Sequence, residues 1–281
     1  SNHIKLRGHS VFGEPDTVIP LWVKSLADSN LVMALQNRLA SVVPHFRGTF
    51  LHWDVNSEML HGSYFTNRLG AWVRPWMFQQ ARALDPDARL FVNDYDVVEG
   101  SLTEQYKQQV QGLRAAGAEI NGLGVEGHFG AAVDADVVGS RIDSLAQLGL
   151  PIWITEYDSL NADEGVRANN LEALCRMAFS KPAVGGILMG GFWAGSHPRG
   201  SNAAMVNLDW TLNAAGRRYQ ALLAEWTTRI NVVTDANGVL RWRGFHGDYE
   251  LVVTLPNGAA IKLPLTLPPG SNSFSSEIGV D

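Results

Sequence analysis

Residues 50–58 read Phe-Leu-His-Trp-Asp-Val-Asn-Ser-Glu, and residues 152–158 read Ile-Trp-Ile-Thr-Glu-Tyr-Asp. Each stretch begins with a short run of apolar, β-branched and aromatic residues, which is typical of a buried strand. Each stretch also carries a glutamate near its end, Glu58 in the first and Glu156 in the second. The pattern therefore predicts two buried strands whose carboxyl ends carry acidic side chains.

Outward from these two stretches, short β-rich runs alternate with longer helical patterns. The predicted strands are Ile4–His9, Phe50–Val55, Arg89–Asn93, Gly122–Glu126, Ile152–Thr155 and Gly186–Met189. The predicted helices are Asn30–Val43, Arg68–Leu84, Leu102–Ala116, Asp136–Leu148, Val166–Phe179 and Ala214–Thr227. This alternation predicts an α/β fold with a parallel sheet and right-handed crossovers. Six βα units are visible, so we expect an incomplete (β/α)8 TIM-type barrel, since a closed one needs two more. An open doubly wound sheet is the alternative, but no Gly-rich phosphate loop follows any strand.

The helical periodicity of the sequence ends after Thr228. We expect residues 1–228 to form the partial barrel domain and residues 229–281 to form a small all-β, β-sandwich-like extension. Its predicted strands are Ile230–Thr234, Val239–Gly244, Tyr249–Leu255, Ala260–Leu265 and Ser273–Ile278. Asn-Gly and similar pairs between them are typical of turns.

Composition excludes several classes of protein. The net charge is −6, from 22 basic and 28 acidic residues, which argues against nucleic acid or an anionic membrane surface as a partner. The apolar runs are too short to span a bilayer, and Ser1–Lys5 shows no signal-peptide core, although a cleaved signal or a larger precursor stays compatible with the sequence. The single cysteine, Cys175, permits neither an intrachain disulfide nor a cysteine metal site. We expect no metal and no cofactor.

Polar or aromatic residues stand at or just after the end of every predicted strand. In chain order they are His9, Glu58, Asn93 with Asp94, Glu126 with His128, Glu156 with Asp158, and Trp193 with His197. In a parallel barrel these strand ends open on one face, where catalytic groups collect. Two carboxylates across such a mouth suit glycoside hydrolysis, in which one protonates the leaving oxygen and the other attacks the sugar or activates water. The alternative is that both are solvated loop glutamates.

Five motifs, in order, resemble those of glycoside hydrolase family 10, the endo-β-1,4-xylanases. They are Arg7-Gly8-His9, Trp53-Asp54-Val55-Asn56-Ser57-Glu58, Phe91-Val92-Asn93-Asp94-Tyr95, Gly124-Val125-Glu126-Gly127-His128 and Ile154-Thr155-Glu156-Tyr157-Asp158. The resemblance covers residues 4–228. It implies a retaining enzyme that acts on a β-linked polysaccharide or oligosaccharide outside the cell or in the periplasm.

The resemblance also implies roles for individual residues. Glu58 becomes the acid/base and Glu156 the nucleophile, with carboxyl groups about 5–5.5 Å apart. His128 is expected to hydrogen-bond Glu156 and to be oriented by Asp158. The expected substrate-binding residues are His9, Trp53, Asn56, Asn93, Glu126, Trp193 and His197.

Departures from the family pattern cluster at the site. The first two βα units are not visible before Ile4, and Ser57 stands where the family has a sugar-binding Asn, with Asn56 one place earlier. Glu126 replaces the family's Gln. Glycine or proline replaces three tryptophans, at Gly13, Gly190 and Pro198.

These departures leave three hypotheses open. The first is a retaining β-glycanase with an open cleft that accepts decorated xylan-like substrates. The second is a catalytically impaired carbohydrate-binding protein on a hydrolase scaffold, and the third is a fragment that assembles with another chain. Because two edge strands lack neighbours, we also expect self-association that covers the open barrel edges.

Overall fold

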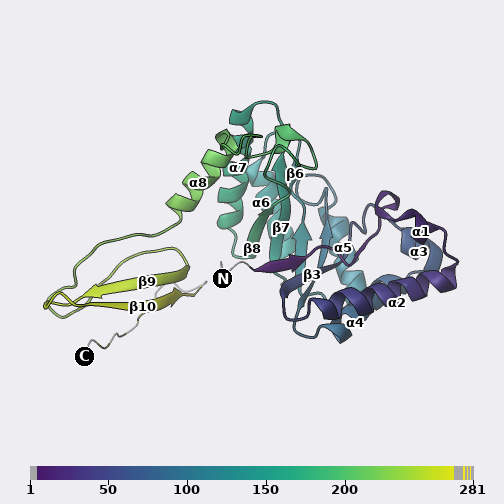
Figure 1. Ribbon diagram of the computed structural model, residues 1–281, viewed down its shortest axis with the longest axis horizontal. Coiled ribbons are helices and arrows are strands. Elements are labelled where there is room, and N and C mark those ends of the chain that lie inside the picture. The colour runs from purple at the N-terminus through teal and green to yellow at the C-terminus, as the bar shows by residue number, and fades with distance from the viewer. Residues whose placement is uncertain (1–4, 269–274, 276, 278, 280–281) are drawn as a thin grey trace. The chain divides into compact units, whose positions relative to one another are not determined.

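A parallel, curled sheet forms the centre of the first part of the chain (Figure 1). The structure is a computed structural model that describes residues 5–268, 275, 277 and 279. Its strands are β1 (Leu6–Gly8), β2 (Phe12–Gly13), β3 (Phe50–Ser57), β4 (Arg89–Asp94), β5 (Gly122–Val125), β6 (His128–Phe129), β7 (Ile152–Ser159) and β8 (Val184–Met189). The long strands follow the order β1-β3-β4-β5-β7-β8, while short β2 pairs with β3 and short β6 with β7. The predicted incomplete TIM-type barrel is confirmed.

Helices connect successive strands, as the alternation predicts. They are α1 (Leu21–Lys24), α2 (Asp28–His45), α3 (Tyr64–Leu69), α4 (Val73–Leu84), α5 (Thr103–Ala115), α6 (Ala135–Ala146), α7 (Glu164–Phe179) and α8 (Ala214–Glu225). The helix predicted at Arg68–Leu84 is shorter than expected, because Gly70 interrupts it with a φ of 93°. Only glycine adopts that conformation at little cost, so α3 ends there and α4 starts after it.

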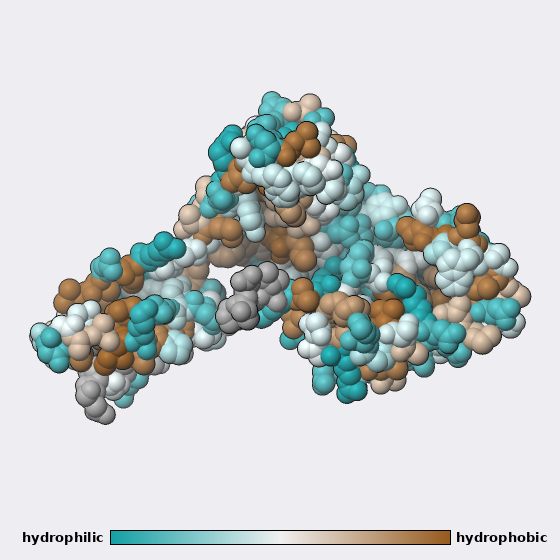
Figure 2. Space-filling model, viewed as in Figure 1, coloured by the Kyte–Doolittle hydropathy of each residue, from teal (hydrophilic) through white to brown (hydrophobic). Residues whose placement is uncertain are grey.

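Strand β8 is much less buried than the strands in the middle of the sheet. Strands β4 and β5 are buried along almost their whole length, whereas no residue of β8 is fully buried. Among the described residues, β8 pairs only with β7 and β1 pairs only with β3. Figure 2 shows hydrophobic residues at the surface where Figure 1 places β8. The sheet therefore has two open edges with apolar residues at one of them.

The second compact unit begins at Arg217 and contains strands β9 (Gly247–Thr254) and β10 (Ala260–Leu267). They form an antiparallel hairpin, which confirms a small all-β appendage. The strands predicted at Ile230–Thr234 and Val239–Gly244 are wrong. Their β-branched residues favour extended backbone, but within the described residues no neighbouring strand pairs with them, and a turn at Asp235 forms between them.

One sheet of two strands therefore stands in the described part of this unit, where we expected a sandwich. The last predicted strand, Ser273–Ile278, lies outside the described residues for most of its length. Across the described residues, no helix is both long and apolar enough to cross a bilayer.

We predict that the open edges at β1 and β8 drive self-association. Unpaired N–H and C=O groups beside half-exposed apolar residues are costly in water, and pairing with a second copy removes that cost. Light scattering across a dilution series should give a mass above that of one chain. A monomer that persists at high concentration would show that exposed edges do not drive assembly here.

Candidate active site

The carboxyl ends of the parallel strands surround a cleft of about 420 Å³. The cleft is lined by Glu58, Tyr95, Asp96, Glu99, Glu126, His128, Glu156 and Arg199. Four of these residues, Glu58, Glu126, His128 and Glu156, were predicted from the sequence. The fold therefore brings the two predicted catalytic glutamates to the same cleft.

Glu156 lies between two histidines. The Nε2 atom of His9 is 3.7 Å from one carboxylate oxygen, and the Nε2 atom of His128 is 3.6 Å from the other. Burial raises the pKa of Glu156, but the hydrogen bond from His128 and the charge of His9 outweigh it, so the pKa lies below the usual value. Glu156 is therefore held in the ionised form.

Each of these histidines donates a hydrogen bond to a buried aspartate. Asp54 accepts a hydrogen bond at 2.9 Å from Nδ1 of His9, and Asp158 accepts one at 2.9 Å from Nδ1 of His128. Because Nδ1 donates to the aspartate, a neutral ring leaves Nε2 as an acceptor and a charged ring makes it a donor. Burial by itself lowers the pKa of His128, yet hydrogen bonds to Asp158 and to its glutamate neighbours raise it to about 11. The ring is thus an imidazolium that donates from both nitrogens.

Each aspartate also pairs with an arginine. Arg7 bonds Asp54, and Arg199 bonds Asp158. The guanidinium and the imidazole N–H provide hydrogen-bond partners for the oxygens of a buried carboxylate. The arrangement on the two sides of Glu156 is therefore the same: one buried aspartate, one histidine and one arginine.

Glu58 follows the end of β3 in a left-handed backbone conformation, with a φ of 58°. That conformation is unfavourable for a residue with a Cβ atom and persists only where its surroundings hold it. Asp94 stabilises the backbone after Glu58, since its oxygens accept hydrogen bonds from the backbone N–H of Leu60 at 2.7 Å and from Nδ1 of His61 at 2.6 Å. Burial, then the charges of Asp94 and Glu156, raise the pKa of Glu58. Glu58 therefore keeps its proton at a pH where Glu156 has lost its own.

Glu126 is a third carboxylate in the cleft, and it is only 2% exposed. One of its oxygens accepts a hydrogen bond at 2.7 Å from Nδ2 of Asn93, and the other lies 3.5 Å from Nε2 of His128. Burial raises the pKa of Glu126 to about 7, with the charges of Glu156 and Glu58 adding to the effect. Asn93 itself is buried and receives a hydrogen bond from Thr155, so it supports Glu126 from below the cleft.

Glu126, His128 and Glu156 offer potential ligand atoms that lie within 4.8 Å of one another. A metal needs the unprotonated nitrogen of a histidine. Because the pKa of His128 is raised to about 11, a cation at this cluster would have to displace the proton on Nε2.

The structure corrects the prediction for Asn56. The register of β3 against β4 shifts between Asp54 and Asn56, which is a β-bulge. The shift turns Asn56 away from the cleft, where its Nδ2 donates to Glu14 at 3.1 Å and contacts the Met77 sulfur at 3.4 Å. Ser57 then takes the inward position, and its Oγ accepts from Asn93. Fully buried Asn56 cannot bind a substrate in this conformation.

The prediction for Trp53 is also wrong. Trp53 is 2% exposed and packs edge-on against Phe50, with ring centroids 4.6 Å apart, on the helix-facing side of β3. Gly8 lies against its ring so closely that an added Cβ would come within 2.2 Å of the indole. Trp53 is therefore part of the core, because the period of two in a strand places it opposite the inward residues His52 and Asp54.

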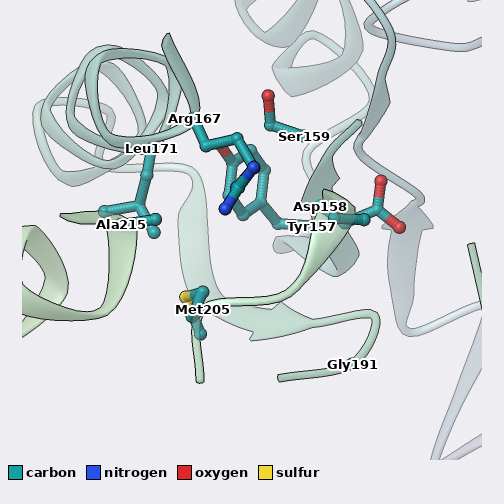
Figure 3. Close-up of a pocket in the computed structure, with 9 residues that line it drawn as sticks. Tyr157, Asp158, Ser159, Arg167, Leu171, Gly191, Met205 and Ala215 are labelled. Atoms are coloured by element: carbon teal, nitrogen blue, oxygen red, sulfur yellow. The ribbon is translucent and has the colours of Figure 1, made fainter. Parts of the chain in front are cut away.

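Trp193 and His197 lie on the segment that follows β8, outside the set of cleft-lining residues. His197 is buried, and its Nδ1 accepts from the backbone N–H of Arg199, so it shapes the loop that carries Arg199. Figure 3 shows the region behind β7, where the Asp158 carboxylate points away from the ring of Tyr157 and from Arg167. The cavity there measures about 10 Å³, room for a single water, so the sugar-sized space is the cleft.

The sequence analysis missed several residues that shape the site. Arg199, Tyr95, Asp96 and Glu99 line the cleft, and His61 holds Asp94. Asp54 and Arg7 stood inside the quoted motifs, and that was the available signal. Arg199 had none, because its loop reaches the cleft only through tertiary folding.

We predict that Glu126→Gln increases stability at alkaline pH. Because the folded state holds the Glu126 proton up to about pH 7 and the unfolded chain releases it near 4.5, stability falls as pH rises between these values. Glutamine has the same shape as the protonated acid and cannot ionise. Urea unfolding should give equal free energies at pH 4 and an advantage for the variant on the order of 2–3 kcal/mol at pH 8. An advantage of the same size at both pH values would contradict this origin.

Comparison with known proteins is consistent with this site. A 47% identical relative over 98% of this chain is the anti-sigma-I factor RsgI6 of Acetivibrio thermocellus, and endo-1,4-beta-xylanase 1 of Arabidopsis thaliana is 39% identical over 93%. The chain covers 36% and 28% of those two proteins. Xylanase 10B from Thermotoga petrophila, solved with xylobiose, superposes with a TM-score of 0.70 at 22% identity over 79% of this chain and 74% of that one. That likeness shows a shared fold.

The sequence model described as glycosyl hydrolase family 10 matches residues 1–203. This match spans both predicted catalytic glutamates and all five motifs, and the order of the strands around the cleft agrees with it. The chain belongs to glycosyl hydrolase family 10.

Proposed function

We propose that this chain is a retaining, endo-acting β-glycanase that hydrolyses β-1,4-linked, xylan-like polysaccharide. The observation that carries the proposal is the opposite perturbation of two carboxyls in one cleft: the pKa of Glu58 is raised and that of Glu156 is lowered. Pairs of carboxyls whose environments separate their pKa values are what an acid and a nucleophile require. In this proposal residues 1–228 form the hydrolase domain and residues 229–281 an extension.

In the first step Glu58 donates its proton to the glycosidic oxygen while the Glu156 carboxylate attacks the anomeric carbon. The leaving sugar departs as an alcohol, and a covalent glycosyl ester of Glu156 forms. His128 and His9 keep Glu156 ionised and aim its oxygens, so less reorganisation is needed when the carboxylate attacks.

In the second step Glu58, now a carboxylate, takes a proton from water, and that water attacks the anomeric carbon. Glu156 leaves with its electron pair and regains its negative charge. The imidazolium of His128 stabilises that charge through its Nε2–H, and Asp158 stabilises the imidazolium through Nδ1. The configuration of the anomeric carbon is retained after two inversions.

The substrate is a polymer, which cannot pass through a bilayer. We therefore place the activity outside the cell or in the periplasm. The chain spans about a third of the length of the two curated relatives described above, so their full activities are no more than a guide.

A second candidate is a sugar-binding module that does not turn its ligand over. Two observations favour it: one relative is an anti-sigma factor by name, and the bulge in β3 buries Asn56 while leaving only Ser57 beside the acid/base. A serine hydroxyl offers one donor where an amide offers two, so contacts to the sugar at the reacting ring are reduced.

Substitution of the two glutamates separates these candidates. We predict that Glu156→Ala abolishes hydrolysis of polymer and aryl glycosides, because the carboxylate that forms the ester is removed. Glu58→Ala should lose polymer hydrolysis yet retain activity on aryl glycosides with good leaving groups, which need no protonation. Product stereochemistry by NMR checks retention. Binding of oligosaccharide by the wild type without any hydrolysis would favour the second candidate.

We predict a preference for decorated or non-xylose β-glycans. Gly190 and Pro198 carry no aromatic ring over the site, so less stacking is available for a plain sugar ring and more room for a branch. Each stacking contact is worth roughly 0.5–1.5 kcal/mol beyond burial of area. Initial rates on a panel of β-linked oligosaccharides provide the measurement, with xylohexaose as the reference. Fastest turnover of the unsubstituted xylo-oligosaccharide would contradict the prediction.

A further inference from the structure

Two tryptophans stack on the segment that follows β8. The rings of Trp193 and Trp210 are nearly parallel, with centroids 4.6 Å apart and planes 9° apart. Two contacts fix the ring of Trp193: it packs against Gly195, and its Nε1 donates to the carbonyl of Leu208 at 3.4 Å. Trp210 is 62% exposed although Trp193 covers one of its faces. The other face of the Trp210 indole is therefore open to solvent.

The backbone presents Trp210 in a fixed way. Trp210 has a φ of 67°, a conformation that costs a non-glycine residue about 1 kcal/mol or more. A tight hairpin holds it, in which Asn207 bonds the backbone of Thr211 and Asp209 accepts from both the N–H and the hydroxyl of Thr211. Bridges from Val206 to Leu212 and to Trp193 join the hairpin to the segment after β8. The exposed ring is thus built into the fold rather than carried on a free loop.

The same segment reaches the catalytic cleft. After Trp193 the chain makes two turns, closed by hydrogen bonds from Ser196 to Trp193 and from Gly200 to His197. Because each turn keeps its ends within about 7 Å, Trp193 lies within about 18 Å of Arg199. Arg199 lines the cleft and bonds Asp158. A polysaccharide that extends out of the cleft is therefore long enough to span the distance to the tryptophans.

From these observations we infer that the Trp193–Trp210 stack is a glycan-binding platform that holds a pyranose ring of the substrate chain outside the catalytic cleft. The inference rests on the proposed function and extends it to a site distant from the reacting bond.

A flat, exposed indole suits the apolar C–H face of a pyranose better than other ligands of a glycanase. Such a contact buries apolar area while the equatorial hydroxyl groups of the sugar stay in water, so no polar group is left without a partner. The ring of Trp210 needs no reordering on binding, since the hairpin and Trp193 already fix it, which reduces the entropic cost of binding. The neighbouring exposed residues Phe192 and Leu208 extend the apolar surface.

The test compares Trp210→Ala with Trp22→Ala. Trp22 lies on α1 and is 63% exposed, so the control removes an indole of equal exposure from another part of the chain. Both substitutions are made in full-length protein that also carries Glu156→Ala, so that ligands are not consumed. Calorimetry then measures the binding of xylobiose, xylohexaose and a decorated xylan oligosaccharide of six or more backbone sugars.

We expect Trp210→Ala to weaken the binding of the long oligosaccharides by about 2- to 12-fold and that of xylobiose by less. Trp22→Ala should leave all three affinities unchanged. Equal affinities of Trp210→Ala and the parent for every long ligand would overturn the platform. A loss that is the same for xylobiose and for xylohexaose would overturn it too, because it would place Trp210 in the cleft or show a general structural effect.

Two further outcomes separate the platform from its rivals. Failure of the parent protein to bind any β-linked oligosaccharide would overturn the proposed function together with the platform. If the parent binds and Trp210→Ala leaves every affinity unchanged, the platform alone is overturned. Sedimentation velocity checks the remaining occupant of an apolar surface, a second copy of the chain. Dissociation of an oligomer by Trp210→Ala, with unchanged glycan affinity, would assign the stack to self-association instead.

Discussion

The site depends on two buried aspartates, each of which holds one histidine and one arginine. Asp54 fixes His9 and Arg7, and Asp158 fixes His128 and Arg199, so that two imidazoles approach Glu156 from opposite sides. A buried carboxylate without such partners would lose its charge or destabilise the fold. Because each aspartate accepts from Nδ1, the Nε2 atoms are directed toward Glu156. The strand ends, the loop after β8 and the chemistry of Glu156 are all linked through these two residues.

The barrel provides these pairs with their geometry, and its openness does not disturb them. Asp54 lies within β3 and His9 follows the neighbouring strand β1, while His128, Asp158 and Arg199 come from the β6–β8 side. Between them, β4 and β5 are buried and supply Asn93, Asp94 and Glu126. The most buried strands therefore lie between the two edges, where β1 and β8 have one neighbour each. The edges also contribute to the cleft, since Arg7 lies on β1 and Arg199 follows β8.

Glu126 adds a buried acidic side chain to this cleft beside Glu58 and Glu156. Its carboxyl is buried beside Glu156 and lies 3.5 Å from Nε2 of His128, and with a pKa of about 7 its charge varies near neutral pH. Glu58, Glu126 and Glu156 therefore titrate as a set, since ionisation of one disfavours ionisation of the others. His128 is shared between Glu126 and Glu156, and Asn93 fixes the second oxygen of Glu126. The number of protons in the cleft is as much a property of this network as of either catalytic glutamate.

The sequence by itself determined most strands and helices of the barrel part and which residues stand at the strand ends, because hydrophobic periodicity and the motifs at strand ends are local properties of the chain. It therefore led to Glu58, Glu126, His128, Glu156 and Asp158. Tertiary structure decided the side of the sheet to which a residue points. The register shift after Asp54 turns Asn56 away from the cleft, and the pleat of β3 places Trp53 on the side that packs against the helices. Tertiary structure also decided that Arg199, distant in sequence from Asp158, completes its ion pair, and that the segments Ile230–Thr234 and Val239–Gly244 do not form strands. The physical reason is the same in each case, since a side chain's environment depends on neighbours that only the folded chain brings together.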